Sequence, residues 1–146
     1  MGGGVELPNV SLCNQENEMH YNPVPQPLIM VYNVDSEEVT DQNIYADYAI
    51  DGNAVFSKIE VDGTEIPITS RFDFGTVGNH TVKYTLIDPT TIPRACFNKC
   101  SPISVTIPSN VTTIGDIAFC KDWLDAESIA SIQAINPNAL TSCIVM

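Results

Sequence analysis

Two segments near the C-terminal end of the chain carry the same residues at a spacing of 22 positions. The matching pairs are Thr91/Thr113, Ile92/Ile114 and Phe97/Phe119. A repeat of this length is typical of a solenoid, in which each unit stacks on the next. We therefore expect each unit to be a short strand, a turn and one helical turn, with the Ile and Phe side chains inside the stack. Gly115 is expected to supply the turn of the second unit.

Two such units cannot bury their own end faces, because a solenoid usually needs three or more units with polar caps. Residues 28–87 offer a cover for the first unit. Short apolar and alternating runs separated by turn signals predict a small antiparallel sandwich there. The predicted strands are Leu28–Val34, Ile44–Ile50, Val55–Val61, Thr64–Ile68, Arg71–Phe74 and His80–Ile87. Asp62-Gly63 predicts a type I′ hairpin turn, and Val77-Gly78-Asn79 predicts another tight turn.

An amphipathic helix is expected to cover the second unit. Asp125 is the predicted N-cap, and isoleucines recur every third residue from Ile129 to Ile135. Asn136-Pro137 ends the helix, because proline cannot continue it. Leu140 to Met146 are expected to return as a sealing tail. Trp123 and Leu124 lie just before the helix, where they could pack against its first turn.

Three parts of the chain follow from these patterns. Residues 1–27 contain Pro8, Pro23, Pro25 and Pro27, which favour an extended arm suited to docking. Residues 28–88 form the sandwich domain, and residues 89–146 form the repeats with their helical cap. The predicted fold class is therefore mainly β.

The segment Ser104–Phe119 resembles the repeat unit of BspA-like leucine-rich repeat proteins. It contains Thr-Ile-Pro followed by Val-Thr-Thr-Ile-Gly-Asp-Ile-Ala-Phe. Thr91–Cys100 looks like a degenerate copy, with Pro93 where the family prefers Gly and Cys96 where it prefers Ala. Residues 54–92 look like the small β domain that often precedes such repeats. The resemblance implies an Ig-like sandwich followed by two short leucine-rich repeats, and it brings no catalytic residues with it.

Charge and hydropathy exclude several classes of function. The 146-residue chain has six basic and eighteen acidic residues, giving a net charge of −12. This argues against nucleic acid, whose phosphates require a basic surface. No apolar run approaches the ~20 residues of a membrane span, so we expect no membrane insertion. The polar sequence after Met1 does not resemble a secretory signal.

The five cysteines are irregularly spaced and odd in number, which does not predict a disulfide framework. Cys96, Cys100 and Cys120 could imitate part of a zinc site, but the paired spacing of such sites is missing. We expect free cysteines that act as small core residues. No metal and no cofactor are predicted.

No nucleophile, base or phosphate-binding loop forms a recognisable catalytic pattern, so we predict that the protein is not an enzyme. His20 and His80 are expected to be exposed or hydrogen-bonded. Aromatic side chains are the remaining candidates for binding, because they can stack on sugars or anchor a partner. The candidates are Tyr21, Tyr45, Tyr48 and Trp123. The alternative for tyrosines in strands is cross-strand packing in the core.

The predicted function is a non-enzymatic structural or binding module exposed on a surface. Relatives of the resembled architecture are found on the virions of phages and on the surfaces of gut bacteria. The first reading is a virion component, such as a capsid decoration, head fibre or tail-associated protein, that docks through the arm at residues 1–27. The alternative is a bacterial cell-surface adhesin that binds host protein or glycan. Expected partners are other proteins, with glycan and a second copy of the chain as further options.

Overall fold

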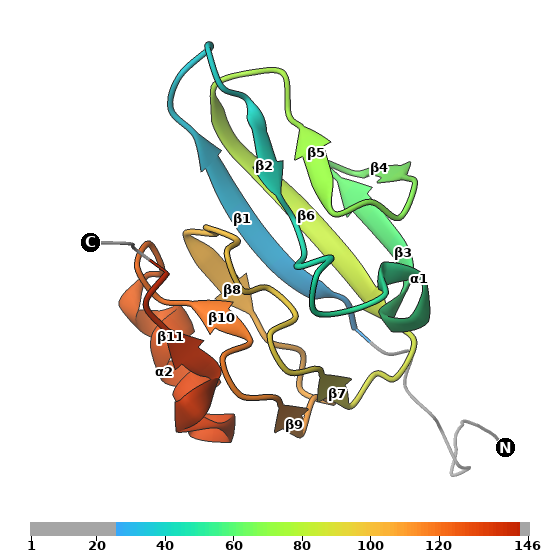
Figure 1. Cartoon of the computed structure of the whole chain (residues 1–146), viewed down its shortest axis with the longest axis vertical. Coiled ribbons are helices and arrows are strands. Elements are labelled where there is room, and N and C mark those ends of the chain that lie inside the picture. Colours follow the sequence, from blue (N-terminus) through green and yellow to red (C-terminus); the bar gives the residue numbers. More distant parts are fainter. Residues whose placement is uncertain (1–25, 144–146) are drawn as a thin grey trace, which may run out of the picture.

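The computed structural model describes residues 26–143, and most regular elements in this range are β-strands (Figure 1). The prediction of a mainly β fold is confirmed. The predicted arm lies outside the described residues except for its last two positions, and Tyr21 lies outside them as well.

Five strands form one antiparallel sheet in the order β4-β3-β6-β1-β8. Their bounds are Leu28–Val34 for β1, Phe56–Val61 for β3, Thr64–Ile66 for β4, Gly78–Leu86 for β6 and Ser104–Thr106 for β8. Asp62 and Gly63 join β3 to β4 with φ angles of 51° and 88°. Both are positive, as the predicted type I′ turn requires. The edge strand β8 comes from the C-terminal part of the chain and pairs with β1.

One face of this sheet is buried. Side chains alternate between buried and partly exposed along β1 and β6, as expected for strands with one solvated face. A short antiparallel ribbon of β2 (Asp41–Asn43) and β5 (Arg71–Asp73) covers one end of the buried face. There, the rings of Tyr32 and Phe74 lie 5.8 Å apart. The C-terminal repeats cover the other end, where the rings of Tyr84 and Phe97 lie 5.0 Å apart.

The two repeats stack in parallel with the predicted offset of 22 residues. β7 (Thr91–Ile92) pairs with β9 (Thr113–Ile114), so that each residue faces its repeat partner. Phe97 and Phe119 form a parallel bridge, and their rings stack at 5.3 Å. The predicted helical turn is absent from both units. Tight turns replace it, with Ala95 and Ile117 in the left-handed region at φ 59° and 51°.

Gly115 has a different role from the one predicted. Its φ lies outside the left-handed region, so the turn does not depend on glycine for its backbone angle. Instead, a Cβ atom here would lie 2.2 Å from the backbone nitrogen of Arg94. Only glycine permits this close approach of the second unit to the first.

We call the first repeat (residues 91–100) the first coil and the second repeat (residues 113–120) the second coil, and a third coil completes the stack. It consists of a 3₁₀ turn, η1 (Pro137–Ala139), and β11 (Leu140–Thr141), which pairs in parallel with β10 (Phe119–Cys120). The Ile117 N–H donates to Asn138 O at 2.9 Å, and the Ala95 N–H donates to Asp116 O at 3.1 Å. Donor and acceptor thus recur at a spacing of 22 residues across all three coils.

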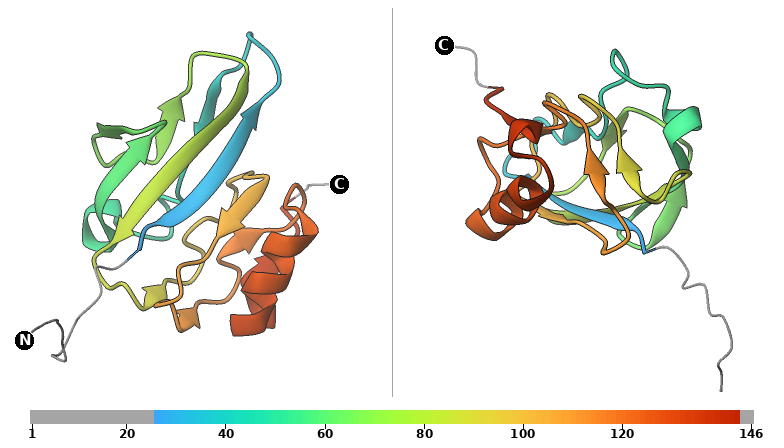
Figure 2. Two further views of the ribbon diagram at one scale, coloured as in Figure 1. Left: turned by 180° about the vertical axis from the view of Figure 1, so that it is seen from behind. Right: turned by 90° about the horizontal axis from the view of Figure 1, so that it is seen from below.

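The C-terminal helix α2 spans Ala126–Ile135 and lies against the side of the stack (Figures 1 and 2). The carboxylate of Asp125 accepts from the Ser128 N–H at 2.8 Å, which confirms the predicted N-cap. Asn136 is the C-cap, so the helix ends where Asn136-Pro137 predicted. Ile132 is buried, and the hydroxyl of Ser128 accepts from the Val105 N–H at 2.8 Å, joining the helix to β8.

One predicted strand is absent from the structure, and two neighbouring predictions differ in detail. Residues 44–50 form a turn-rich segment, in which the Ala46 N–H donates to Cys96 O at 2.8 Å. Ile44, Tyr45 and Ala46 are buried in succession, whereas Tyr48 is exposed, so burial in this segment does not alternate as it would in a strand. A short helix, α1 (Gly52–Val55), precedes β3 and is capped by Asp51. The predicted turn at residues 77–79 lies mostly within the start of β6.

Candidate functional site

A polar hollow of about 350 Å³ lies where the ribbon, the end of β1 and the first coil meet. Its volume falls in the range of small-molecule sites. Five segments supply the lining side chains, which are Asn33, Asp35, Gln42, Asn43, Arg71, Lys99, Ser101, Ile103 and Trp123. Ile103 is the only aliphatic one, so hydrogen-bonding groups and one indole dominate the surface.

The β2–β5 ribbon holds Arg71 in place. Its Nε–H donates to Asp41 Oδ2 at 2.7 Å, and its Nη1 donates to Asn43 Oδ1 at 3.0 Å. Arg71 and Asn43 are direct partners in the ribbon register. The guanidinium beside Asp41 lowers the pKa of that carboxyl below its usual value, so the carboxylate form is favoured.

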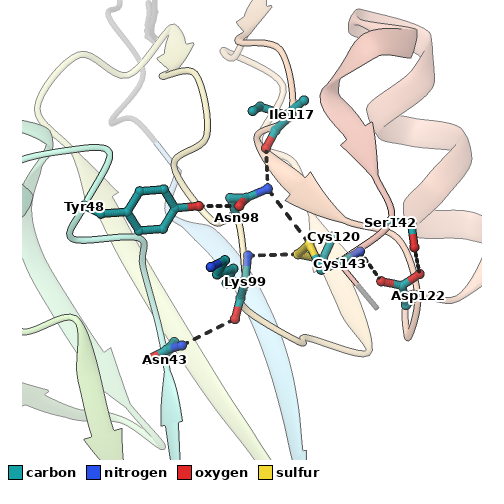
Figure 3. The surroundings of a disulfide bond; sticks show 9 residues. All are labelled: Asn43, Tyr48, Asn98, Lys99, Ile117, Cys120, Asp122, Ser142 and Cys143. Carbon is teal, nitrogen blue, oxygen red and sulfur yellow. Dashed lines mark hydrogen bonds between the residues drawn. A yellow bond between two sulfur atoms is a disulfide. The ribbon is translucent and has the colours of Figure 1, made fainter. Parts of the chain in front are cut away.

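Lys99 reaches the hollow from the end of the first coil, with its backbone in the left-handed region at φ 69°. Its N–H donates to Cys120 Sγ at 2.9 Å, and its carbonyl accepts from Asn43 Nδ2 at 3.5 Å (Figure 3). Its Nζ lies 5.6 Å from the centre of the Tyr48 ring, within range of a cation–π contact. Among residues 26–143, no carboxylate forms an ion pair with this ammonium.

A disulfide between Cys120 and Cys143 adjoins the hollow and corrects the prediction of free cysteines throughout. Asp122 accepts from Ser142 Oγ at 3.1 Å and from the Cys143 N–H at 2.6 Å, fastening the tail beside β10 (Figure 3). The third coil brings Cys143 to Cys120, and because the repeat pattern does not predict that coil, it could not predict the pair. Cys96 and Cys100 are free and buried, as expected for core residues. Burial raises the pKa of both thiols, so they stay protonated.

Three of the four predicted binding aromatics lie within residues 26–143, and they occupy different environments. Trp123 lines the hollow with 52% of its surface exposed. Tyr48 is 62% exposed and lies beside the hollow, where its hydroxyl donates to Asn98 Oδ1 and its ring meets Lys99. Tyr45 is a core residue, because it is buried with its ring 5.5 Å from that of Phe56. The structure therefore brings Trp123 and Tyr48 to one region and places Tyr45 in the interior.

The polar lining residues were missed by sequence reasoning. Asn33, Asn43 and Lys99 are single polar residues in strand ends and turns, where they have no distinctive spacing. Only the ribbon register and the position of the first coil bring them together. Two of the six basic residues of the chain, Arg71 and Lys99, line this one hollow in a protein with a net charge of −12.

Other chemistry-bearing residues lie away from the hollow. His80 is buried and hydrogen-bonded to Asp62, so the prediction of a hydrogen-bonded histidine is confirmed. Within residues 26–143, no three His, Cys, Asp or Glu side chains are grouped so that they could hold a metal ion. No helix in the same range is long and apolar enough to cross a membrane.

The groups in the hollow can donate and accept hydrogen bonds and can offer an aromatic face, so they could bind a polar ligand. Comparison of the chain with known protein families, with curated proteins and with solved structures gave no match.

Proposed function

We propose that the protein is a non-enzymatic binding module displayed on a surface, as a component of a phage virion. In this proposal the arm at residues 1–27 docks on the particle, and the polar hollow faces outward. The observation that carries the binding role is the hollow itself. A half-exposed indole, three amide side chains and two cations converge there from segments far apart in the sequence.

The architecture that accompanies this function is also a proposal. We infer an Ig-like sandwich built on β1 to β6, followed by short leucine-rich repeats. The parallel pairing of Ile92 with Ile114 at the repeat spacing supports the solenoid part. The antiparallel sheet with one buried face supports the sandwich part.

A second candidate is a bacterial cell-surface adhesin that binds host protein or glycan. The disulfide between Cys120 and Cys143 favours it, because disulfides form and persist in oxidising environments outside the cytoplasm. A virion protein assembled in a reducing cytoplasm would gain this bond only after release from the cell.

Immunogold labelling distinguishes the two. Antibodies against the purified chain are applied to the organism that carries the gene, before and after phage induction, and to particles purified by density gradient. Gold on the particles is expected. Gold on the envelope of uninduced cells would replace the virion by the adhesin. Protein found only in the soluble fraction of lysed cells would contradict surface display altogether.

The docking role of the arm has its own test. A chain lacking residues 1–24 should keep the circular dichroism spectrum of the full chain and lose co-sedimentation with particles. Co-sedimentation that survives this deletion would assign docking to the described part of the chain.

A further inference from the structure

We propose that the polar hollow is a carbohydrate site that binds an uncharged sugar, with one pyranose ring stacked on Trp123. This inference rests on the proposed function, because it names the ligand of the proposed binding module. It goes further in assigning the chemical class of that ligand and the residue that provides the stacking surface.

Trp123 supplies the stacking surface. Its side chain lines the hollow with about half of its surface in solvent, although tryptophan is usually among the more buried residues. The next residue, Leu124, is buried, and its N–H donates to Lys121 O at 3.2 Å. The backbone that carries the indole is thus fixed, which lowers the entropy lost on binding. The apolar C–H face of a sugar ring matches an indole face, while the ring hydroxyls remain available for hydrogen bonds.

The rest of the lining suits hydroxyl groups. Each sugar hydroxyl donates one hydrogen bond and accepts others, so it needs donors and acceptors close together. Amide side chains provide both from one group, and three of the nine lining residues are Asn33, Gln42 and Asn43. Ser101 adds a hydroxyl, Asp35 adds acceptors, and Lys99 adds donors.

The charge in the hollow favours an uncharged ligand. The cation of Arg71 is already paired with Asp41, and the other lining cation, Lys99, shares the hollow with one carboxylate, that of Asp35. A phosphate or sulfate group would require an excess of positive charge. A hydrophobic peptide anchor would require an apolar pocket, whereas Ile103 is the only aliphatic side chain here.

Several contacts hold the site in one shape. Gln42 Nε2 donates to the Asn33 carbonyl at 2.9 Å, joining the ribbon to β1. Asn43 connects Arg71 to the Lys99 carbonyl, and the Lys99 N–H is bonded to the disulfide sulfur of Cys120. A site held in this way needs little rearrangement when a ligand binds.

The test is binding of the purified full chain to an array of neutral oligosaccharides built from glucose, galactose, mannose and N-acetylglucosamine. Sulfated and uronic acid oligosaccharides are printed beside them. The best neutral ligand is then titrated by calorimetry. Trp123→Ala should weaken its affinity by about tenfold or more, and Trp123→Phe should retain part of it. Ile87→Ala is the matched control, because Ile87 is 53% exposed and follows the end of β6 remote from Asn33.

Selective neutral-sugar binding that depends on Trp123 and not on Ile87 would support the assignment. Three results would overturn it: no oligosaccharide bound, affinity unchanged in Trp123→Ala with its melting temperature preserved, or binding confined to charged oligosaccharides and abolished by about 0.5 M salt. Surface labelling with no sugar binding would contradict the carbohydrate site and leave the proposed surface display intact. Sugar binding by a protein confined to the cytosol would contradict surface display and leave the carbohydrate site intact.

Discussion

His80 has an acceptor at each ring nitrogen. Nδ1 lies 2.7 Å from Asp62 Oδ2, Nε2 lies 2.9 Å from the Thr76 carbonyl, and the ring stacks on Phe74 at 4.9 Å. Only the imidazolium form can donate to both acceptors at once. The hydrogen bond that His80 donates to Asp62 raises the pKa of His80 above 6.5, against the effect of burial. The same bond lowers the pKa of Asp62 below 3.8.

The pair makes stability depend on pH in both directions. Because the folded pKa of His80 is raised, its contribution is complete below pH 6.5 and is lost as pH rises through the folded value. Because the folded pKa of Asp62 is lowered, its contribution is complete above pH 3.8 and is lost on acidification. We therefore expect the melting temperature to fall as pH rises from about 6 to 9. In His80→Gln that fall should flatten, and an unchanged slope would contradict the role given to His80.

Gly115 tests the close packing of the first two coils. In Gly115→Ala the new Cβ would meet backbone atoms of Arg94 and Pro93, which cannot move without separating the coils. We expect a loss of about 2–3 kcal/mol in the free energy of unfolding, measured by urea denaturation. Gly75→Ala is the control, because its φ of 79° is strained for alanine while its surroundings are open. That strain costs about 1 kcal/mol. Equal losses in the two variants would show that the coils are not in close contact.

At the scale of elements, the sequence predicts strand β1, the repeat register and the C-terminal helix, and it misses the third coil. The 22-residue spacing predicts the register of β7 with β9, and Asp125 and Asn136 mark both ends of α2. The third coil escapes prediction because its residues do not match the repeat, although Pro137 follows Gly115 by the same interval. At this position in the third coil, a side chain takes the place of the backbone bond between paired strands. Asn136 Nδ2 donates to Ile114 O at 2.7 Å.

The disulfide should stabilise this third coil. Cys120 and Cys143 are 23 residues apart, and closing a loop of that length stabilises a fold by about 3 kcal/mol. Reduction should therefore lower the unfolding free energy by about this amount, and Cys143→Ser should do the same without reductant. Adding reductant to Cys143→Ser is the control and should change nothing further. A reductant effect that persists in this variant would place its origin elsewhere.

For the whole molecule, the candidate site depends on long-range contacts that no local pattern encodes. Trp123 could be predicted as a binding residue from its chemistry alone. Its neighbours in the hollow come from β1, the ribbon and the first coil, and one of them, Asn33, precedes Trp123 by ninety positions in the sequence. Tyr45 has the same chemistry as Tyr48, yet Tyr45 is buried with its ring beside that of Phe56, whereas Tyr48 is 62% exposed. Residue type predicts candidates, and tertiary packing selects among them.

The same long-range contacts join the two predicted domains. Strand β8 from the C-terminal part completes the sheet by pairing with β1. Phe97 of the first coil lies between the rings of Phe56 and Tyr84 on one side and Phe119 on the other. The buried residues of both parts form a single hydrophobic cluster.

We therefore expect that a polypeptide of residues 26–88 does not fold alone. Its sheet would lack β8 and would expose the aromatic face that Phe97 covers, and a chain of this size has little other apolar area to bury. Urea denaturation of this fragment, monitored by far-UV circular dichroism, should show no cooperative transition. Mixing it with residues 89–146 should restore one, since the missing strand and the missing ring arrive together. A cooperative transition in residues 26–88 alone would instead establish an autonomous domain that ends near residue 88, and would make the shared core a contact between two domains.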